Sequence, residues 1–195
     1  ILIFGNGQLG NLYKDFFNNE NSKAEIAKSD ITNENEVEKE IQEFKPNIVI
    51  NATAYNNVDL AEKEYELTYK TNAIGQYNIS LIQQKIPFLF IHYSTDYVFD
   101  GKKETSLYTE QDTPNPISQY GKSKHFGEIL LNNDLSNTLI FRVSWLFGKG
   151  KQNFIYKFLE WTKQHDNLKI STNEVSIPTS TKTIVEITIK AIEAN

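Results

Sequence analysis

The sequence predicts an α/β protein built on a doubly wound parallel sheet. Short apolar runs alternate with longer amphipathic ones along the chain, which is typical of β-α-β units. The apolar runs are continuous rather than alternating with polar residues, as in parallel strands that helices cover on both faces. The stretch "GNGQLG" (Gly5–Gly10) follows the first run directly and opens a helical pattern.

The expected strands are the most apolar runs. Four are clear, namely Ile1–Phe4, the start of Asn47–Tyr55, Pro87–Thr95 and Thr138–Trp145. Ala24–Ala27 and Leu168–Ser171 are weaker candidates.

Amphipathic periodicity predicts helices between these strands. They are Gln8–Asn19, Glu34–Phe44, Asp59–Gln84, Ser118–Asn133, Gln152–Gln164 and Thr181–Glu193. The longest expected loop is Gly101–Ser118, and loops of that length are often functional.

Composition narrows the function classes. The chain has 195 residues, a net charge of −5 and no cysteine, which excludes disulfides, thiolate catalysis and cysteine-based zinc sites. Acidic and basic residues are spread along the chain, so no nucleic-acid partner is expected. No apolar run reaches the roughly 18 residues of a spanning helix, and no signal peptide is seen before the first strand. We expect a cytoplasmic protein without a membrane partner.

The glycine turn has the spacing G-x-G-x-x-G, at Gly5, Gly7 and Gly10. Glycines let the backbone turn tightly and approach a pyrophosphate, which then binds at the helix N-terminus. A plain glycine-rich turn between strand and helix is the alternative.

Two strand ends are candidates for ligand contact. Ala52, Thr53 and Ala54 follow one buried strand, and their small side chains would let a ligand lie against the backbone, as ligands do at the carboxyl edge of open α/β sheets. Thr95 ends the next strand, where its hydroxyl could hydrogen-bond a substrate oxygen. A tight turn explains the first feature equally well, Asp96 could cap the following segment, and His92 is interpreted as a core histidine.

In "SQYGKSKHFGE" (Ser118–Glu128), Tyr120 and Lys124 stand four residues apart, so they share one face of a helix. A free tyrosine has a pKa of about 10 and exchanges protons poorly near neutral pH. A cation one turn away would lower that pKa. The alternative is a tyrosine that packs beside a lysine stem.

Cofactor preference depends on the end of the second strand. NAD-preferring sites carry an acid there, about 20 residues after the glycines, for the ribose 2′-hydroxyl. Lys28 and Ser29 stand there instead and could contact a 2′-phosphate. This favours NADPH, with NADH left open, unless Lys28 is simply solvated.

Taken together, "GNGQLG", "NATAYNNVDLAE", "IHYSTDYVFDG", "YGKSKHFGE", "FRVSWLFGKGKQNF" and "IPTS" make the chain resemble the extended short-chain dehydrogenase/reductases. Within that group it looks most like the dTDP-4-dehydrorhamnose reductase family. The resemblance covers Ile1 to about Ala191. It implies a Rossmann-like fold and NADPH-dependent reduction of the C4 ketone of a dTDP-linked 4-keto-6-deoxy sugar, in polysaccharide biosynthesis. Family members carry one more residue between the first two glycines, G-x-x-G-x-x-G.

The resemblance also implies roles for individual residues. Tyr120 would donate a proton to the ketone, Lys124 would bind the nicotinamide ribose and lower the pKa of Tyr120, and Thr95 would orient the carbonyl. Residues implied to hold the cofactor are Gly5, Gly7, Gln8, Leu9, Gly10, Asp30, Ile31, Ala52, Thr53, Ala54, Asn72, Tyr120 and Lys124. Substrate contacts implied are Asp96, Tyr97, Trp145 and Asn153.

The resemblance divides the chain into a nucleotide-binding part, residues 1–145, and the start of a small substrate-binding part, residues 146–195, which is expected to be incomplete. A homodimer is expected by default, and no metal site is expected. Two alternatives stay open: a reductase of another nucleotide-linked 4-keto-6-deoxy sugar, and a non-catalytic regulatory subunit on the same fold.

Overall fold

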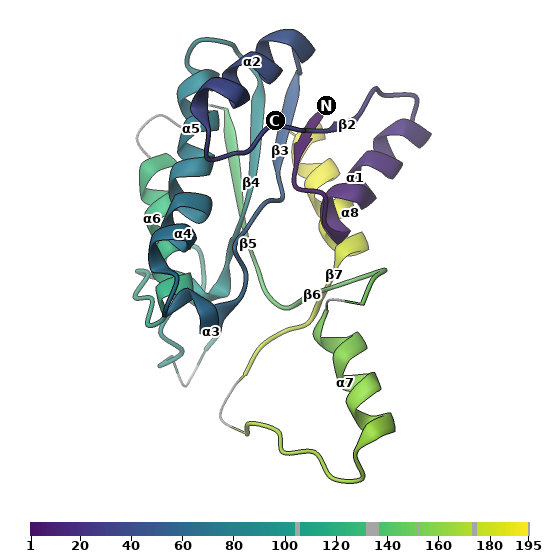
Figure 1. The fold of residues 1–195 in the computed structure, drawn as a ribbon, viewed down its shortest axis with the longest axis vertical. Helices are drawn as coiled ribbons and strands as arrows, with labels where there is room; N and C mark the ends of the chain where they lie inside the picture. The colour runs from purple at the N-terminus through teal and green to yellow at the C-terminus, as the bar shows by residue number, and fades with distance from the viewer. Residues whose placement is uncertain (104–105, 132–136, 152, 173–174, 195) are drawn as a thin grey trace.

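A five-stranded parallel sheet forms the centre of the molecule (Figure 1). The computed structural model describes residues 1–103, 106–131, 137–151, 153–172 and 175–194. The strands are β1 (Leu2–Phe4), β2 (Glu25–Ile26), β3 (Ile48–Asn51), β4 (Leu89–Thr95) and β5 (Thr138–Val143), in the order β2-β1-β3-β4-β5. In the sheet, β2 lies on one side of β1 and β3 lies on the other side of it, so the chain winds in both directions from β1. The predicted doubly wound parallel sheet is therefore confirmed, including the weak strand at Ala24–Ala27.

Helices cover both faces of the sheet. α1 (Gln8–Asn19) and α8 (Thr181–Glu193) lie on one face, and α2 (Glu34–Phe44), α5 (Gly75–Gln83) and α6 (Gln119–Leu131) lie on the other (Figure 1). Successive strand residues serve opposite layers, as the pleat requires. Ile3 packs with Tyr13 of α1 and Ile184 of α8, whereas Leu2 belongs to the buried cluster that holds Ile41 of α2. α8 comes from residues 146–195, so that segment also helps to cover the sheet.

The single helix expected over Asp59–Gln84 is wrong. The segment folds as α3 (Val58–Ala61), α4 (Tyr65–Tyr69), the π-helix η1 (Lys70–Ile74) and then α5. The side chain of Asn57 starts α3 by accepting a hydrogen bond from Leu60 N at 3.1 Å. π-helical turns occur frequently at functional sites, and this one places Asn72 in the interior, where it is 1% exposed.

The C-terminal part departs further from expectation. β6 (Leu146–Phe147) and β7 (Thr179–Ser180) pair in a separate parallel sheet that the sequence did not predict. α7 (Phe154–Gln164) lies away from both helix layers (Figure 1). The strand expected at Leu168–Ser171 is wrong, since that largely exposed segment belongs to neither sheet. Gln152 and the expected end of a helix at Asn133 lie outside the described residues.

α6 is attached to the sheet by an ion pair. Arg142 of β5, the only arginine in the sequence, donates from Nε to Glu128 Oε1 at 3.0 Å and from Nη2 to Oε2 at 2.7 Å. Burial, the largest single effect, would raise the pKa of Glu128, but the hydrogen bonds and charge of Arg142, together with the Ser94 hydroxyl and His125, hold this pKa below its ordinary value. Bidentate pairs of this kind fix geometry as well as charge.

On its other side α6 packs closely against η1 and α5. A Cβ added at Gly127 would overlap the side-chain amide of Gln76 and would lie 2.6 Å from the carbonyl oxygen of Asn72. A side chain at this position would push α6 away from η1, because a backbone oxygen cannot yield as the end of a flexible side chain can.

We therefore expect Gly127→Ala to lower the free energy of unfolding by about 1–3 kcal/mol, the usual cost of overpacking. Lys122→Ala, at an exposed position of the same helix, is the control and should change stability by less than about 0.5 kcal/mol. Denaturant unfolding measures both. Equal stability of the two variants would show that the helices are not in close contact here.

Candidate active site

The turn between β1 and α1 lies against the end of β3. Gly5 has a φ of 109°, which glycine adopts readily and other residues do not. A Cβ added at Gly5 would lie 2.7 Å from the carbonyl carbon of Ala52. The glycine therefore permits both the backbone angle and the close approach of the two loops.

The N-terminus of α1 is suited to an anion. Gly7 begins the helix without a side-chain cap, the first turn has no acidic residue, and no atom lies within 4 Å of a Cβ added there. Helix N–H groups without a partner, at the positive end of the helix dipole, bind phosphates. The predicted dinucleotide turn therefore has open space and hydrogen-bond donors for a pyrophosphate.

The other predicted cofactor residues differ in how far their side chains are exposed to solvent. Gln8, Ala52, Thr53 and Ala54 are at least partly exposed around the turn. Asp30 is exposed after β2, and hydrogen bonds from Thr32 N and Oγ1, both 2.9 Å, hold its pKa below the ordinary value. The side chains of Leu9 and Ile31 are buried in the core, so only their backbone groups can meet a ligand.

The segment expected to meet a 2′-phosphate is partly occupied by the protein itself. Glu40 of α2 accepts hydrogen bonds from the backbone N–H groups of Lys28 and Ser29 at 2.8–3.1 Å. Only the exposed side chain of Lys28 extends beyond this contact. The preference for NADPH over NADH therefore stays a prediction.

The structure brings Thr95 and Tyr120 together at the carboxyl end of β4. Tyr120 is near the start of α6, and its ring lies edge-on to Tyr97 with centroids 5.7 Å apart. Burial raises the pKa of Tyr120 to about 12, a hydrogen bond with the Thr95 hydroxyl opposes this rise, and the Asp96 carboxylate adds to it. Tyr120 is therefore a protonated phenol at neutral pH, which can act as a proton donor.

Lys124 lies one turn further along α6 and is 1% exposed. Its Nζ donates to the carbonyl oxygen of Tyr93 at 2.5 Å and lies 3.3 Å from His92 Nε2. The lysine nitrogen is thus directed to β4. The expectation that Lys124 lowers the pKa of Tyr120 stays a prediction.

Asn72, one of the residues implied to hold the cofactor, connects η1 to α6. Its amide bonds both backbone groups of Tyr55, at 2.8 and 2.9 Å, and its Nδ2 also donates to Ser123 Oγ at 3.0 Å. Ser123 in turn donates to the carbonyl oxygen of Tyr120 at 2.7 Å. Asn72 thus positions the first turn of α6, on which Tyr120 stands.

Asp96 links β4 to the C-terminal part. Its Oδ2 accepts hydrogen bonds from Ser144 at 2.7 Å and from Ser176 at 3.2 Å, and the two serine hydroxyls bond each other. Sequence reasoning did not identify either serine, because nothing in the local pattern marks residues that meet only when β4, β5 and the segment before β7 come together. The carboxylate is largely used by the protein, although it remains next to Tyr120.

Trp145 and Asn153 differ in their suitability as substrate contacts. Trp145 has a φ of 40°, which is a strained angle for a bulky residue, and such strain is often found at functional sites. Its ring packs on Phe154 of α7 at 4.5 Å. Asn153 instead caps α7, accepting from Tyr156 N at 2.9 Å and donating to Gly150 O at 2.9 Å. Its buried amide is used by the protein, which disfavours the expected sugar contact.

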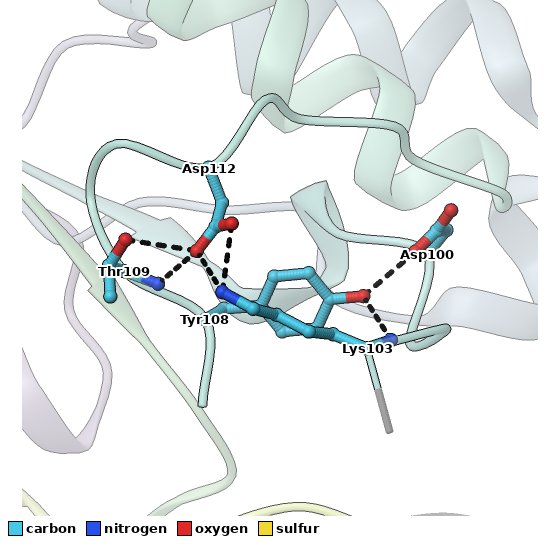
Figure 2. A network of polar contacts seen from close by, with 5 residues as sticks. All are labelled: Asp100, Lys103, Tyr108, Thr109 and Asp112. Atoms are coloured by element: carbon cyan, nitrogen blue, oxygen red, sulfur yellow. Dashed lines mark hydrogen bonds and ion pairs between the residues drawn. The ribbon is translucent and has the colours of Figure 1, made fainter. Parts of the chain in front are cut away.

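The long loop after Tyr97 is held by its own side chains (Figure 2). Lys103 Nζ pairs with both oxygens of Asp112 at 2.8–2.9 Å, and Tyr108 donates to Asp100 at 2.8 Å. Hydrogen bonds from Lys103 and Thr109 lower the pKa of Asp112 to about 2. These contacts tie the described residues before position 104 to those after position 105, next to the predicted substrate residues.

A cavity of about 720 Å³ lies elsewhere, at the amino ends of the strands. It is lined by Gln42, Lys45, Pro46, Asn47, Ile86, Pro87, Phe88, Leu89 and Asn137. It contains none of the hydroxyl, glycine or buried amine groups described above, so the chemistry of the carboxyl edge, rather than the size of a cavity, marks the candidate site.

Comparisons with known proteins show the family of the chain. A family model described as "RmlD substrate binding domain" matches residues 1–195. A dTDP-4-dehydrorhamnose reductase of Aggregatibacter actinomycetemcomitans is 37% identical over 169 residues, which are 87% of this chain and 57% of the relative. The spore coat polysaccharide biosynthesis protein SpsK of Bacillus subtilis is 38% identical over 75% of this chain and 52% of its own length. The chain thus spans about half the length of these curated relatives.

Solved structures extend the similarity to the fold. A dTDP-4-dehydrorhamnose reductase of Clostridium acetobutylicum superposes with a TM-score of 0.94 at 38% identity, over 99% of this chain and 70% of that one. The Bacillus anthracis dTDP-4-dehydrorhamnose reductase, solved in complex with NADP, gives 0.92 at 34% identity, over 98% of this chain and 70% of that one. Because the family model spans the whole sequence and these folds superpose closely, the chain belongs to the RmlD substrate binding domain family, the family of the dTDP-4-dehydrorhamnose reductases.

Proposed function

We propose that this chain carries the cofactor-binding and catalytic part of an NADPH-dependent dTDP-4-dehydrorhamnose reductase. The product would be dTDP-L-rhamnose, formed by reduction of the C4 ketone of dTDP-4-dehydro-L-rhamnose for cell-surface polysaccharide. The observation that carries the proposal is that Thr95, at the end of β4, and Tyr120, near the start of α6, come close enough for the Thr95 hydroxyl to affect the pKa of the phenol. The two hydroxyls lie at the carboxyl edge of a sheet whose first turn fits a pyrophosphate. The names of the relatives support the choice of substrate.

Each residue can be given a role in this reaction. When bound, the nicotinamide supplies the hydride. Tyr120 donates a proton to the ketone oxygen. Its pKa of about 12 keeps it protonated at neutral pH but makes it a weak acid, so stabilisation of the phenolate aids the transfer. Thr95 hydrogen-bonds the same oxygen and orients it. General acid catalysis of this kind typically contributes a factor of about 10²–10⁴ in rate.

The surrounding residues hold the reactants. Lys124 is assigned to the nicotinamide ribose, and the N-terminus of α1 to the pyrophosphate. Tyr97 and Trp145 are assigned to the sugar, with Asp96 beside them. The division between a nucleotide-binding part, residues 1–145, and a substrate-binding part, residues 146–195, is proposed on the same grounds, although α8 packs on the sheet.

The reductase role predicts that Tyr120→Phe lowers kcat by a factor of about 10²–10⁴, because the phenol proton is lost while the ring stays. NADPH oxidation in the presence of dTDP-4-dehydrorhamnose measures it. Tyr65→Phe, a phenol removed from an exposed position on α4, is the matched control and should retain full turnover.

Turnover by Tyr120→Phe equal to that of the control would refute the proposed acid. Turnover by the wild type only with another nucleotide-linked 4-keto-6-deoxy sugar would change the substrate and keep the mechanism. NADPH binding without turnover on any such sugar would favour a regulatory subunit.

The pyrophosphate site predicts that Gly7→Ala weakens NADPH binding by roughly tenfold or more, equivalent to about 1.4 kcal/mol. The added methyl group meets no protein atom, so the free energy of unfolding should change by less than about 0.5 kcal/mol. Asp15→Ala, exposed on the same helix, is the control for calorimetric titration. Unchanged affinity in Gly7→Ala would place the cofactor elsewhere.

Several expectations stay predictions. Among the described residues no helix is both long and apolar enough to cross a membrane, and no group of three or more acidic or histidine side chains is arranged to hold a metal ion. Cytoplasmic location, independence from metal and assembly as a homodimer can be measured by fractionation, chelation and light scattering.

A further inference from the structure

Three buried polar side chains form a row beneath the catalytic edge. Asn51 ends β3, His92 lies opposite it in the register of β4, and Lys124 reaches in from α6. Each is 1% exposed or less. Asn51 Nδ2 is 3.1 Å from His92 Nδ1, and His92 Nε2 is 3.3 Å from Lys124 Nζ. At these distances the three side chains are hydrogen-bonded in series, so the group that donates in one contact determines which group donates in the next.

The orientation of the Asn51 amide is fixed by the backbone. Thr53 N lies 2.9 Å from Asn51 Oδ1, and a backbone N–H can only donate. The side-chain oxygen must therefore face Thr53, and the NH₂ group must face His92. Reversing the amide would place two donors against each other.

The orientation of Asn51 then fixes the tautomer of His92. Nδ1 accepts the hydrogen bond from Asn51, so the ring proton is on Nε2, since neutral imidazole has one donor and one acceptor. That proton points at Lys124 Nζ. An ammonium group has no acceptor, whereas an amine accepts through its lone pair and still donates to the Tyr93 carbonyl oxygen.

We propose that Asn51 and His92 hold Lys124 as a neutral amine, and that His92 is a positioning residue which sets the proton occupancy of Lys124. The chain of donors runs from Thr53 through Asn51 and His92 to Lys124, and each group in it is satisfied only in this protonation state.

The electrostatics of the surroundings agree. Burial lowers the pKa of Lys124 to about 7, and the carboxylate of Glu128 on the same helix raises it only in part. Arg142 of β5 pairs with Glu128, and His125 lies 3.5 Å from it. Burial, followed by repulsion from Lys124, lowers the pKa of His92 well below its ordinary value. Thus no imidazolium forms near neutral pH, and Lys124 titrates there.

One consequence rests on the proposed function. A cation near Tyr120 would stabilise the phenolate that remains when the phenol gives up its proton. The ammonium form of Lys124 exists below its pKa and is lost above it. Turnover should therefore fall as pH rises through about 7, and Asn51 and His92 should determine where that fall occurs.

The tautomer of His92 is the direct test. ¹⁵N NMR of histidine-labelled protein without ligand distinguishes a protonated from a bare ring nitrogen. The chain has three histidines, so His92 is identified by the signal missing from His92→Gln, and His125 and His165 serve as internal references. We expect Nε2 protonated and Nδ1 bare at neutral pH. A wild-type His92 with its proton on Nδ1, or with both nitrogens protonated, would overturn the proposal.

Asn51→Asp is the matched perturbation. A carboxylate only accepts, so it should move the ring proton to Nδ1, turn Nε2 into an acceptor and favour the ammonium form of Lys124. The ¹³Cε signal of Lys124, assigned with Lys124→Met, should titrate near pH 7 in wild type and about one unit or more higher in Asn51→Asp. A wild-type titration near the ordinary value of about 10 would contradict the neutral amine.

The wild-type readouts need no turnover, and the variants His92→Gln and Lys124→Met serve only to assign the signals. Failure of the proposed function would leave a bare Nδ1 and a low titration of Lys124 without reductase activity. Failure of this inference would leave activity with an Nδ1-protonated ring or a lysine that titrates normally. A purely structural role of Asn51 would change stability but not the titration of Lys124.

Discussion

The candidate site depends on one buried nitrogen. Lys124 Nζ donates to the carbonyl oxygen of Tyr93 at 2.5 Å, so helix α6 has to cross β4 at one height and one rotation. That crossing sets the position of Tyr120 one turn earlier, beside Thr95. A buried amine is costly unless its hydrogen bonds are made, and here Tyr93 and His92 both lie within reach of it.

Other contacts hold the same helix from its remaining sides. Arg142 pairs with Glu128 at the far end of α6, while Asn72 of η1 reaches Ser123 near its start. The glycine at position 127 lets the backbones of α6 and η1 approach. Because these contacts come from separate elements, the position of Tyr120 is determined by the fold rather than by a flexible loop. Precise placement of an acid is what proton transfer requires.

The features that could be predicted from the sequence are those that depend on residues close together in the chain. The strands were predictable because two covering layers demand continuous apolar runs, and Tyr120 and Lys124 were predictable because four residues make about one helical turn. The break at residues 62–64 and the π-helical segment η1 were not, since apolar periodicity continues through residues 59–84 while Asn72 is drawn inward by distant partners. The direction of Lys124 also depends on a group remote in sequence, the carbonyl oxygen of Tyr93, whereas Asn153 caps α7 through a local contact with Tyr156 N. Asn51 and His92 meet only because β3 lies beside β4.

The most direct test of the account is a crystal structure of the protein with NADP⁺. The account predicts the pyrophosphate on the N-terminus of α1 at Gly5–Gly10, with the nicotinamide ribose next to Lys124 and the nicotinamide ring within reach of Tyr120 and Thr95. A dinucleotide bound at another edge of the sheet, or one whose nicotinamide points away from Tyr120, would contradict the central claim that this edge is a reductase site.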